Sequence, residues 1–459
     1  MRYNFIGEKS REFNAWWEWM EQMNRRNFLK FLVGGVFLLG GGAFLSKGAW
    51  YRQAANGVRE LAGDLDAQYL RQIIAADPST SRTLMWQSAA PLSNPRIEYR
   101  QKRQEEAAAV SASEDFFTDD GVTNYQYAAS LAGLLPDTAY EYRLVSETSA
   151  SDWHPLHTAG EDSFQCLIFP DSQSNDYSDW ERVAQEAAKR NPEAAFFINM
   201  GDIVDNGEDH TQWQAWFHAV ENIMDSIPFV PVMGNHETYD QNWNVRLPEA
   251  YLRYFVVPEN GSRDFARYYY SFDYGAVHFI VLNSQWEETE DFKPGLMEEQ
   301  MEWFREDVRK SKKKWKIVLI HRDVLQYRIH NRPERQEGIS DVGEVFMPLF
   351  EELGIDIVFT AHLHTYRNRG HIRDMSHDSN GPLYILTGVA GNVRYPGLWI
   401  DHALDERVAP QPETDNYLTM DVSKERILIQ CFLPDGQEID RVEVDKADLE
   451  QSPFQGVVL

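Results

Sequence analysis

Cysteine is scarce in this chain of 459 residues, which contains only two, Cys166 and Cys431. Neither belongs to a CxxC pair, and no cysteine–histidine spacing typical of a structural zinc site occurs. Both lie in apolar, strand-like runs, FQCLIF and ILIQCF. Two buried thiols are therefore the expected arrangement, and one disulfide between them is the alternative.

Positive charge is also in short supply. The chain has 44 lysines and arginines against 72 aspartates and glutamates, a formal net charge of −28 at pH 7. This balance argues against a broad basic face and against nucleic acid as a partner. It would also repel an anionic ligand at long range. A site for such a ligand must therefore carry positive charge of its own.

The apolar run near the N-terminus, residues 31–45, is short. Its 15 residues would span about 22 Å as a helix, less than a hydrocarbon core of about 30 Å. It follows the paired arginines of NRRNFLK, and together they resemble a twin-arginine export signal. We expect a signal over residues 1–50, a linker over 51–65, and export across a prokaryotic cytoplasmic membrane through the twin-arginine machinery. The product would be periplasmic, on the cell surface or secreted. No clean A-x-A cleavage site follows, so a membrane tether through residues 31–45 is the alternative.

Short alternating strands separated by turn residues fill residues 66–160. Thr138, Tyr140, Tyr142 and Leu144 alternate onto one face of a strand. The segment LAGLLPDTAYEYRL resembles the late strands of a fibronectin type III-like sandwich, with Tyr140 placed like the corner tyrosine of that fold. We therefore expect an N-terminal all-β domain here.

Strands and helices alternate over most of residues 161–445, which predicts α/β layers. Buried strands such as AAFFINM and KIVLI are followed by helix-like segments. The end of this region alternates as a β-meander, and a tail, residues 446–459, follows it.

Polar side chains follow five of these apolar strands directly. They are Asp171 and Gln173, Asp202 and Asp205, Asn235 and His236, His321, and His362 and His364. Each alone has an ordinary explanation, such as a helix cap. In open α/β sheets, however, sites form at the carboxyl ends of the strands. The five strand ends together predict one site.

The residue types indicate what this site binds. Carboxylate, carboxamide and imidazole ligands without thiolates suit intermediate divalent metals, or ferric iron beside a divalent partner. The set is too large for one metal ion. Two ions that share a carboxylate can hold a phosphoryl group and generate hydroxide at neutral pH. They would also supply the positive charge that the chain otherwise lacks.

The order Asp-x-Gln, GDIVD, GNHE, VLIH and AHLH resembles the calcineurin-like metallophosphoesterase superfamily. The preceding sandwich, with YYYSFDYGAVHFIVLNSQ and HTYR, makes the chain most similar to the purple acid phosphatase branch, from residue 66 to about residue 400. The resemblance implies a fibronectin type III-like sandwich followed by a catalytic domain over 161–445. That domain would be a β-sandwich core flanked by helices, in four αββα layers.

The resemblance also implies roles for the site residues. Asp171 and His364 would hold the first metal ion, and Asp202 would bridge to the second. Asn235, His321 and His362 would hold the second ion. His236 would be the general acid or contact the phosphate. The two ions would be Fe, Zn or Mn, and the sequence does not choose among them.

Two residues depart from the purple acid phosphatase pattern. Gln173 stands where that branch has glycine and where other superfamily members have a histidine ligand. Its carbonyl oxygen would bind the first metal ion, or its amide would hydrogen-bond a ligand. Asp205 stands where the purple enzymes have a tyrosine ligand to iron. We expect its carboxylate to orient His236 and the protein to be colourless.

The expected function is that of an exported dinuclear-metal phosphoesterase, acting chiefly on small phosphomonoesters. A metal-bridging hydroxide would attack phosphorus, and His236 would protonate the leaving alkoxide. Phosphodiester or nucleotide hydrolysis at the same site, and a non-catalytic cell-surface binding protein, are the alternatives.

Arg367 and Arg394 follow the last ligand strands and are candidates for substrate contact. Glu237 is expected to anchor hydrogen bonds, with a solvated loop carboxylate as the alternative. The sequence does not indicate an oligomeric state.

Overall fold

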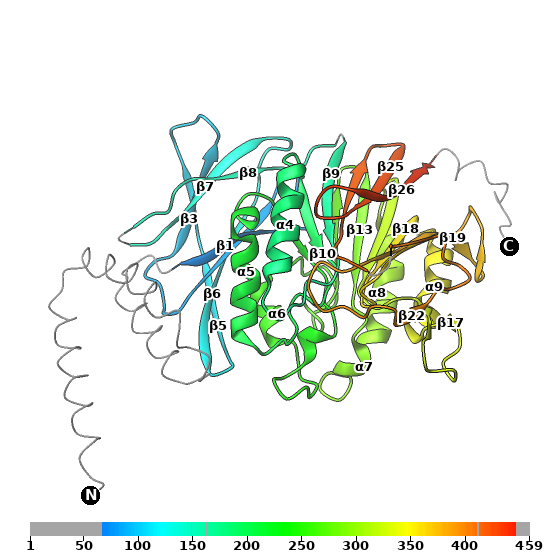
Figure 1. Cartoon of the computed structure of the whole chain (residues 1–459). Helices are drawn as coiled ribbons and strands as arrows, with labels where there is room; N and C mark the ends of the chain where they lie inside the picture. Colours follow the sequence, from blue (N-terminus) through cyan, green and yellow to red (C-terminus); the bar gives the residue numbers. More distant parts are fainter. Residues whose placement is uncertain (1–66, 148, 162, 411–412, 447–459) are drawn as a thin grey trace, which may run out of the picture. The chain divides into compact units, whose positions relative to one another are not determined.

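A computed structural model describes residues 67–147, 149–161, 163–410 and 413–446 of the chain (Figure 1). All of them belong to one compact unit, Gly63–Leu459. The predicted export signal or tether, the linker after it and residues 447–459 of the predicted tail lie outside the described residues. Within the described ranges, no helix is long and apolar enough to cross a membrane.

The N-terminal part consists of strands in two layers. One layer holds β1 (Gln68–Ile73), β2 (Arg82–Ser88), β6 (Val122–Leu131) and β5 (Ser113–Asp119). The other is a four-stranded sheet in the order β4 (Ala108–Ser111), β3 (Arg96–Gln101), β7 (Ala139–Val145) and β8 (His154–His157). Trp86 and Tyr127 stack in the core between them. The hydroxyl of Tyr140 accepts a hydrogen bond from the backbone N–H of Leu135 at 3.0 Å, as expected of a corner tyrosine. The predicted strand-rich N-terminal domain is confirmed.

The first of these layers continues into a ten-stranded sheet. Its order is β26-β25-β24-β9-β10-β11-β1-β2-β6-β5. The remaining strands are β9 (Phe164–Phe169), β10 (Phe196–Asn199), β11 (Phe229–Pro231), β24 (Tyr417–Val422), β25 (Arg426–Phe432) and β26 (Glu438–Asp445). β9, β10 and β11 are parallel, and α4 (Ser178–Arg190) and α5 (His210–Met224) connect them. The last three strands form the predicted antiparallel meander.

A second sheet faces the first. It contains β12 (Tyr270–Tyr274), β13 (Val277–Leu282), β14 (Trp315–Ile320), β18 (Ile357–Thr360), β21 (Leu383–Thr387), β19 (Tyr366–Arg373) and β20 (Ser376–His377) in that order, with β23 (Arg407–Val408) on β19. Rings from the two sheets meet in the core, as Phe196 and Phe279 do at 5.7 Å. Parallel pairing of β13, β14, β18 and β21 places their carboxyl ends along one edge.

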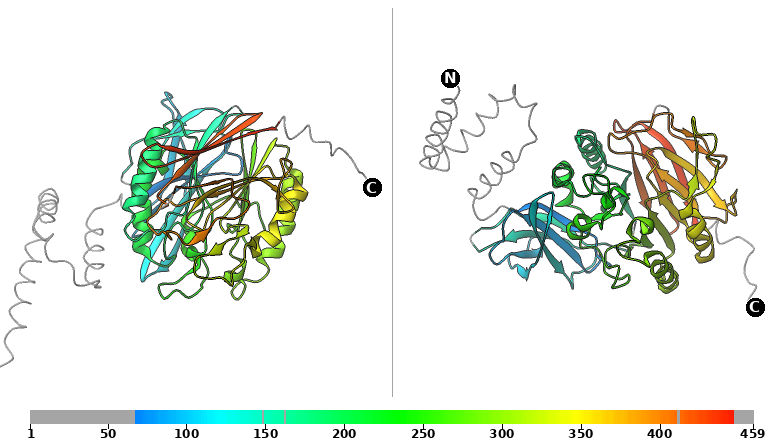
Figure 2. Two further views of the ribbon diagram at one scale, coloured as in Figure 1. Left: turned by 45° about the vertical axis from the view of Figure 1, so that its right-hand side comes forward. Right: turned by 90° about the horizontal axis from the view of Figure 1, so that it is seen from below.

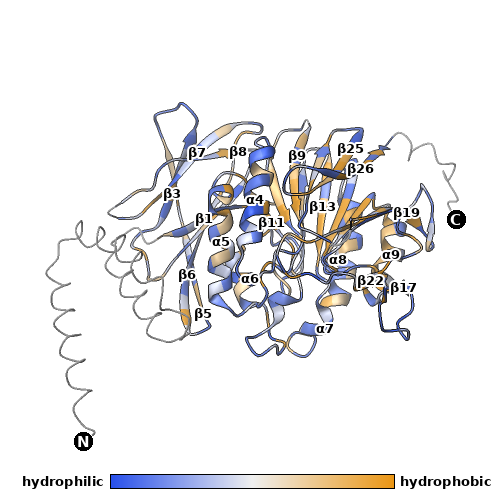
Figure 3. Cartoon of the chain, in the orientation of Figure 1, coloured by the Kyte–Doolittle hydropathy of each residue, from blue (hydrophilic) through white to orange (hydrophobic). Residues whose placement is uncertain are grey.

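Helices cover the outer faces of both sheets. Trp180 of α4 and Trp216 of α5 pack into the core of the first sheet. The second sheet is covered by α8 (Leu296–Lys310) and α9 (Asp341–Leu353), through Phe304 and Phe346. Figure 2 shows strands between the two groups of helices. In Figure 3 the central strands β9 and β13 are hydrophobic and α4 is largely hydrophilic. The predicted αββα arrangement is confirmed.

Both cysteines are buried and free. Cys166 on β9 lies opposite Met420 of β24, and Cys431 on β25 lies opposite Leu418 of the same strand. The β24 backbone therefore separates the two thiols. The expectation of two buried thiols is confirmed, and the alternative of a disulfide does not occur.

Candidate metal centre

Five strand ends, from both sheets, contribute to one cluster of polar side chains. Asp171, Asp202 and Asn235 follow β9, β10 and β11 of the ten-stranded sheet, whereas His321 and His362 follow β14 and β18 of the facing sheet. His321 accordingly lies 3.1 Å from Asp202, measured from Nε2 to Oδ2. The cluster thus forms where the carboxyl ends of strands from two sheets meet.

Two groups of potential metal ligands share one residue. Asp202, His321 and His362 form one group, and Asp171, Asp202 and His364 form the other. Within each group the ligand atoms lie within 4.8 Å of one another. Asp202 is therefore the carboxylate common to both.

Asn235 extends the first group, and a short contact joins two members of the second. The side-chain oxygen of Asn235 lies 3.3 Å from Nε2 of His321, the nitrogen that also faces Asp202. Nε2 of His364 lies 3.2 Å from Oδ2 of Asp171. Oxygen and nitrogen donors therefore point toward a common centre from each side of Asp202.

Backbone carbonyls hold the imidazole rings in orientation. Nδ1 of His321 donates to the carbonyl of Met200 at 2.9 Å, and Nδ1 of His364 donates to that of Val393 at 2.5 Å. Each ring therefore presents Nε2 to the cluster. Metal-binding histidines are held by this kind of outer hydrogen bond. Burial lowers the pKa of His321, but the Asp202 carboxylate outweighs it and raises the pKa to about 9.

Two side chains at the centre contain buried polar atoms with no partner among the described residues. Neither amide atom of Gln173, and not Nδ1 of His362, has a hydrogen-bond partner among the residues that the structure describes. Leaving buried polar atoms unpaired is unfavourable. The orphaned atoms, the shared carboxylate and the oriented imidazoles together fit the binding of metal ions with oxygen and nitrogen ligands.

The backbone at the centre is unusually close-packed and includes left-handed conformations. Asp202, His362 and His364 have φ values of 46°, 75° and 53°, which are uncommon outside glycine. A Cβ at Gly234 would lie 2.2 Å from Oδ1 of Asp202. Only glycine at that position lets the GNHE segment approach the shared carboxylate.

His236 lies beside the two groups. Its Nδ1 donates to the backbone carbonyl of Asp205 at 2.7 Å, whereas the Asp205 carboxylate lies 3.7 Å from the same nitrogen. Nε2 lies 3.9 Å from Oδ2 of Asp202. The proximity expected between Asp205 and His236 is present, but the short contact comes from the main chain of Asp205 and not from its side chain.

The carboxylate of Glu237 binds four backbone N–H groups. They belong to Gly234 at 2.7 Å, Ile203 at 2.8 Å, Asp202 at 3.1 Å and Val204 at 3.4 Å. Burial and the Asp202 charge raise the pKa of Glu237 to about 7. Glu237 thus joins the GDIVD and GNHE loops. The expectation of a hydrogen-bond anchor is confirmed.

The two arginines predicted to contact substrate have other partners. Arg367 is 1% exposed, and its Nη1 donates to Asp405 at 2.7 Å and to Asp401 at 2.8 Å. The guanidinium of Arg394 pairs with Asp415 and lies 3.4 Å from Asp179. The structure thus gives both arginines ion pairs within the fold.

Sequence reasoning did not assign two exposed rings that border the centre. The ring of Trp243 lies 5.7 Å from that of His236, and the ring of Tyr395 lies 4.9 Å from that of His364. Both follow the strand-end motifs in irregular loops. Periodicity gives no signal in such segments, which explains the omission.

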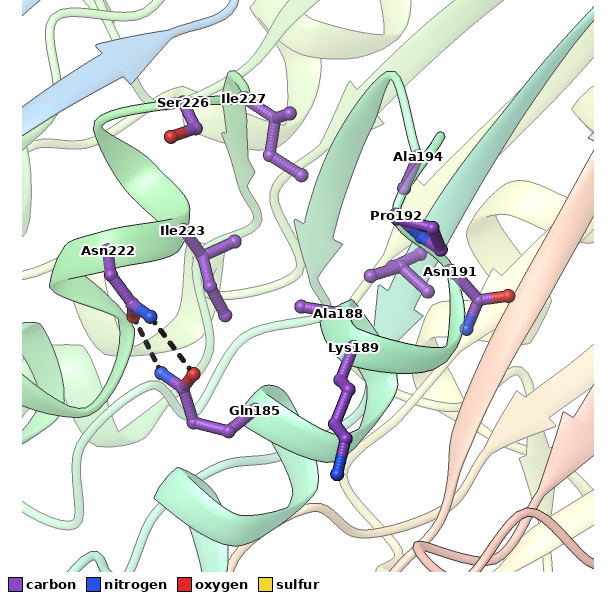
Figure 4. A pocket seen from close by; sticks show the side chains of 11 residues that line it. Gln185, Ala188, Lys189, Asn191, Pro192, Ala194, Asn222, Ile223, Ser226 and Ile227 are labelled. Carbon is purple, nitrogen blue, oxygen red and sulfur yellow. Dashed lines mark hydrogen bonds between the residues drawn. The ribbon is translucent and has the colours of Figure 1, made fainter. Parts of the chain in front are cut away.

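A hollow of about 310 Å³ lies elsewhere, beside α4 and α5 (Figure 4). Gln185 and Asn222 hydrogen-bond each other across it, and Ala194 lines it just before β10. Asp202 follows the other end of β10. The hollow contains none of the predicted site residues.

Comparisons with known proteins agree with this geometry. The model of the calcineurin-like phosphoesterase family matches residues 149–366. Residues 149–366 therefore form a calcineurin-like phosphoesterase domain. The model of the purple acid phosphatase N-terminal domain matches residues 69–158, so the chain resembles purple acid phosphatases in both of its domains.

Individual relatives cover different shares of the chain. Purple acid phosphatase 15 of Arabidopsis thaliana is 30% identical over 207 residues, which are 44% of this chain and 36% of that protein. Purple acid phosphatase 23 of the same plant is 23% identical over 370 residues, 72% of this chain and 75% of that protein. The match to the first thus spans about a third of that relative's length.

A solved structure supports the fold. Purple acid phosphatase PPD1 from yellow lupin seeds matches with a TM-score of 0.68 at 17% identity, over 86% of this chain and 78% of that one. At this identity the likeness concerns the fold.

Proposed function

We propose that the chain hydrolyses phosphate esters, chiefly monoesters, at a centre of two metal ions. The observation that carries the proposal is the pair of ligand groups sharing Asp202, with His236 beside them. The printed names of the relatives, purple acid phosphatases, support phosphate monoesters as substrates.

The residues divide between the two ions. Asp171 and His364 would hold one ion, and Gln173 offers its unpaired amide oxygen there. Asn235, His321 and His362 would hold the other, with Asp202 shared. Iron, zinc and manganese all suit these donors. Such ions would act as Lewis acids and lower the pKa of bound water. They would also offset the negative charge of the chain.

His236 would handle the proton. Because Nδ1 donates to the carbonyl of Asp205, a protonated ring presents Nε2–H to the centre. Water would attack phosphorus in line as the bond to the alcohol oxygen breaks. The leaving alkoxide would take the proton from Nε2 of His236, which is general acid catalysis.

The test is hydrolysis of an aryl phosphate together with elemental analysis of the purified protein. Asp202→Asn and Asn235→Ala should each abolish turnover, and Asp202→Asn should lower the content of both metals. Asn222→Ala, beside the hollow of Figure 4, is the control and should retain full activity. Turnover by the Asp202→Asn protein after metal chelation would refute the proposal. Parallel rates on an aryl phosphate and a bis-aryl phosphate would test the monoester preference.

Two further proposals accompany this function. Asp205 replaces the tyrosine that binds iron in purple enzymes, so the metal-loaded protein should show no visible tyrosinate-to-iron absorption band.

The NRRNFLK segment and the apolar run after it support export by the twin-arginine machinery. Replacing Arg25 and Arg26 together by lysine should leave the protein in the cytoplasmic fraction, whereas Lys47→Gln should not. Unchanged fractionation of the double variant would refute the export proposal.

A further inference from the structure

Two large aromatic side chains at the metal centre are exposed. Trp243 is 56% exposed and Tyr395 is 41% exposed. They lie beside different parts of the centre, Trp243 next to His236 and Tyr395 next to His364. Exposed aromatic rings beside a polar site are available for contact with a ligand.

The loop that carries Trp243 is held firmly. Asp240 accepts hydrogen bonds from the backbone N–H groups of Asn242 and Asn244, each at 2.8 Å. The backbone N–H of Asp240 donates to the carbonyl of Asn244 at 2.9 Å. Trp243 itself has a φ of 64°, a conformation that is unfavourable for a bulky residue. The fold therefore maintains an exposed ring in a strained backbone position.

The rings of Trp243 and His236 are nearly perpendicular, with an interplanar angle of 88°. Tyr239 also meets His236 edge to face, at 5.7 Å and 85°. Tyr239 therefore already packs against the imidazole of His236. Trp243 keeps more than half of its surface for another contact.

Tyr395 borders the other side of the centre. Its ring is tilted by 37° to that of His364. The phenol therefore offers a flat ring and a hydroxyl group beside the centre.

We propose that Trp243 and Tyr395 bind the organic group of the substrate, and that the preferred esters are those of flat aromatic or heteroaromatic alcohols. This inference rests on the proposed phosphoesterase function. Stacking on a ring adds affinity without charge, which suits an acidic chain whose Arg367 and Arg394 are already paired. The two rings would recognise the alcohol, and the metal centre would recognise the phosphate.

The competing explanation is that the rings only position His236 and His364. Positioning would affect all substrates equally and would shift the pH profile of kcat/KM. Recognition of the alcohol would affect aromatic substrates alone and leave the pH profile unchanged. The two explanations therefore differ in a ratio between substrates.

Binding of non-hydrolysable phosphonates tests this ratio without turnover. Calorimetry on the purified protein with its resident metal would compare 2-naphthylphosphonate with methylphosphonate. We expect the naphthyl compound to bind at least about tenfold more tightly to the unaltered protein. Trp243→Ala and Tyr395→Ala should each reduce that preference by about tenfold, whereas Trp243→Phe should largely keep it. Phe116→Ala, which removes another exposed ring (61%) from the N-terminal domain, should leave it unchanged.

Equal binding of the two phosphonates by the unaltered protein would overturn the inference. So would equal weakening of both in the alanine variants, or a shifted pH profile of kcat/KM. Hydrolysis of phosphate esters is measured separately on the same preparation. If turnover fails while the aromatic preference and its loss are observed, the proposed function is wrong and the aromatic subsite stands.

Discussion

At the scale of single residues, the contact between His236 and Asp205 separates a main-chain role from a side-chain role. His236 donates to the Asp205 carbonyl at 2.7 Å, and the carboxylate is farther away, at 3.7 Å. Asp205→Asn keeps the carbonyl, so we expect it to lower kcat for an aryl phosphate by less than about tenfold. His236→Asn removes the proposed proton donor and should lower kcat by about 10²–10⁴. Equal losses in the two variants would show that the carboxylate of Asp205 is essential.

Glu237 gives a second prediction at this scale, for stability. Glu237→Ala would leave four buried N–H groups without their acceptor. We expect the free energy of unfolding to fall by roughly 3 kcal/mol or more, as measured by urea denaturation. Glu306→Ala removes a carboxylate whose partner is Lys310 on the exposed face of α8, and should leave stability nearly unchanged. Similar effects from both would contradict the anchoring role.

At the scale of secondary-structure elements, His278 joins two strands to a helix. On β13 its Nδ1 lies 2.7 Å from Asp273 of β12 and its Nε2 lies 3.0 Å from Asp307 of α8. Lys316 lies opposite it on β14. Burial lowers the pKa of His278, but the two carboxylates outweigh this and raise it to about 9. The protonated ring therefore stabilises the contact between the second sheet and its covering helix.

The raised pKa of His278 predicts a pH dependence of stability. The stabilisation is complete below about pH 6.5, the pKa of an unperturbed histidine, and is lost as the pH rises through about 9. The difference corresponds to at most ~3.5 kcal/mol. We expect denaturant unfolding of the protein to show this decline between pH 6.5 and 9, and His278→Gln to remove most of it. The same slope in both proteins would contradict the prediction.

The elements also show which features of the site can be predicted from the sequence. The gathering of Asp202, His321 and the other candidate ligands at one place was predictable because each follows an apolar run, and parallel strands align their carboxyl ends. The partner of Arg367 was not, because Asp405 lies 38 residues away in the chain and no periodicity links them. The carbonyl that holds His236 was also missed, since motif patterns name side chains and not the main-chain groups that those side chains contact.

At the scale of the whole described unit, one sheet runs through both parts of the chain. β1 of the N-terminal domain pairs in parallel with β11 of the phosphoesterase domain, with Ile73 opposite Phe229. The side chain of Gln72 donates to the carbonyl of Asp225 at the end of α5, at 3.0 Å, and the hydroxyl of Tyr142 donates to the same carbonyl at 2.8 Å. These contacts are buried or partly buried. The two domains are therefore packed together and are not joined by a flexible linker alone.

The shared sheet predicts that both domains unfold together. Because the loss of β1 would expose the edge of β11 and leave Gln72 and the Asp225 carbonyl unpaired, neither domain should unfold alone. Calorimetry should give one transition with equal calorimetric and van't Hoff enthalpies. Amide exchange in β6 and β14 should become unprotected at the same denaturant concentration. Gln72→Ala should lower that concentration for both strands, whereas Phe116→Ala should affect neither. Earlier loss of protection in β6 alone would mean that the N-terminal sandwich is an independent unit despite the continuous sheet.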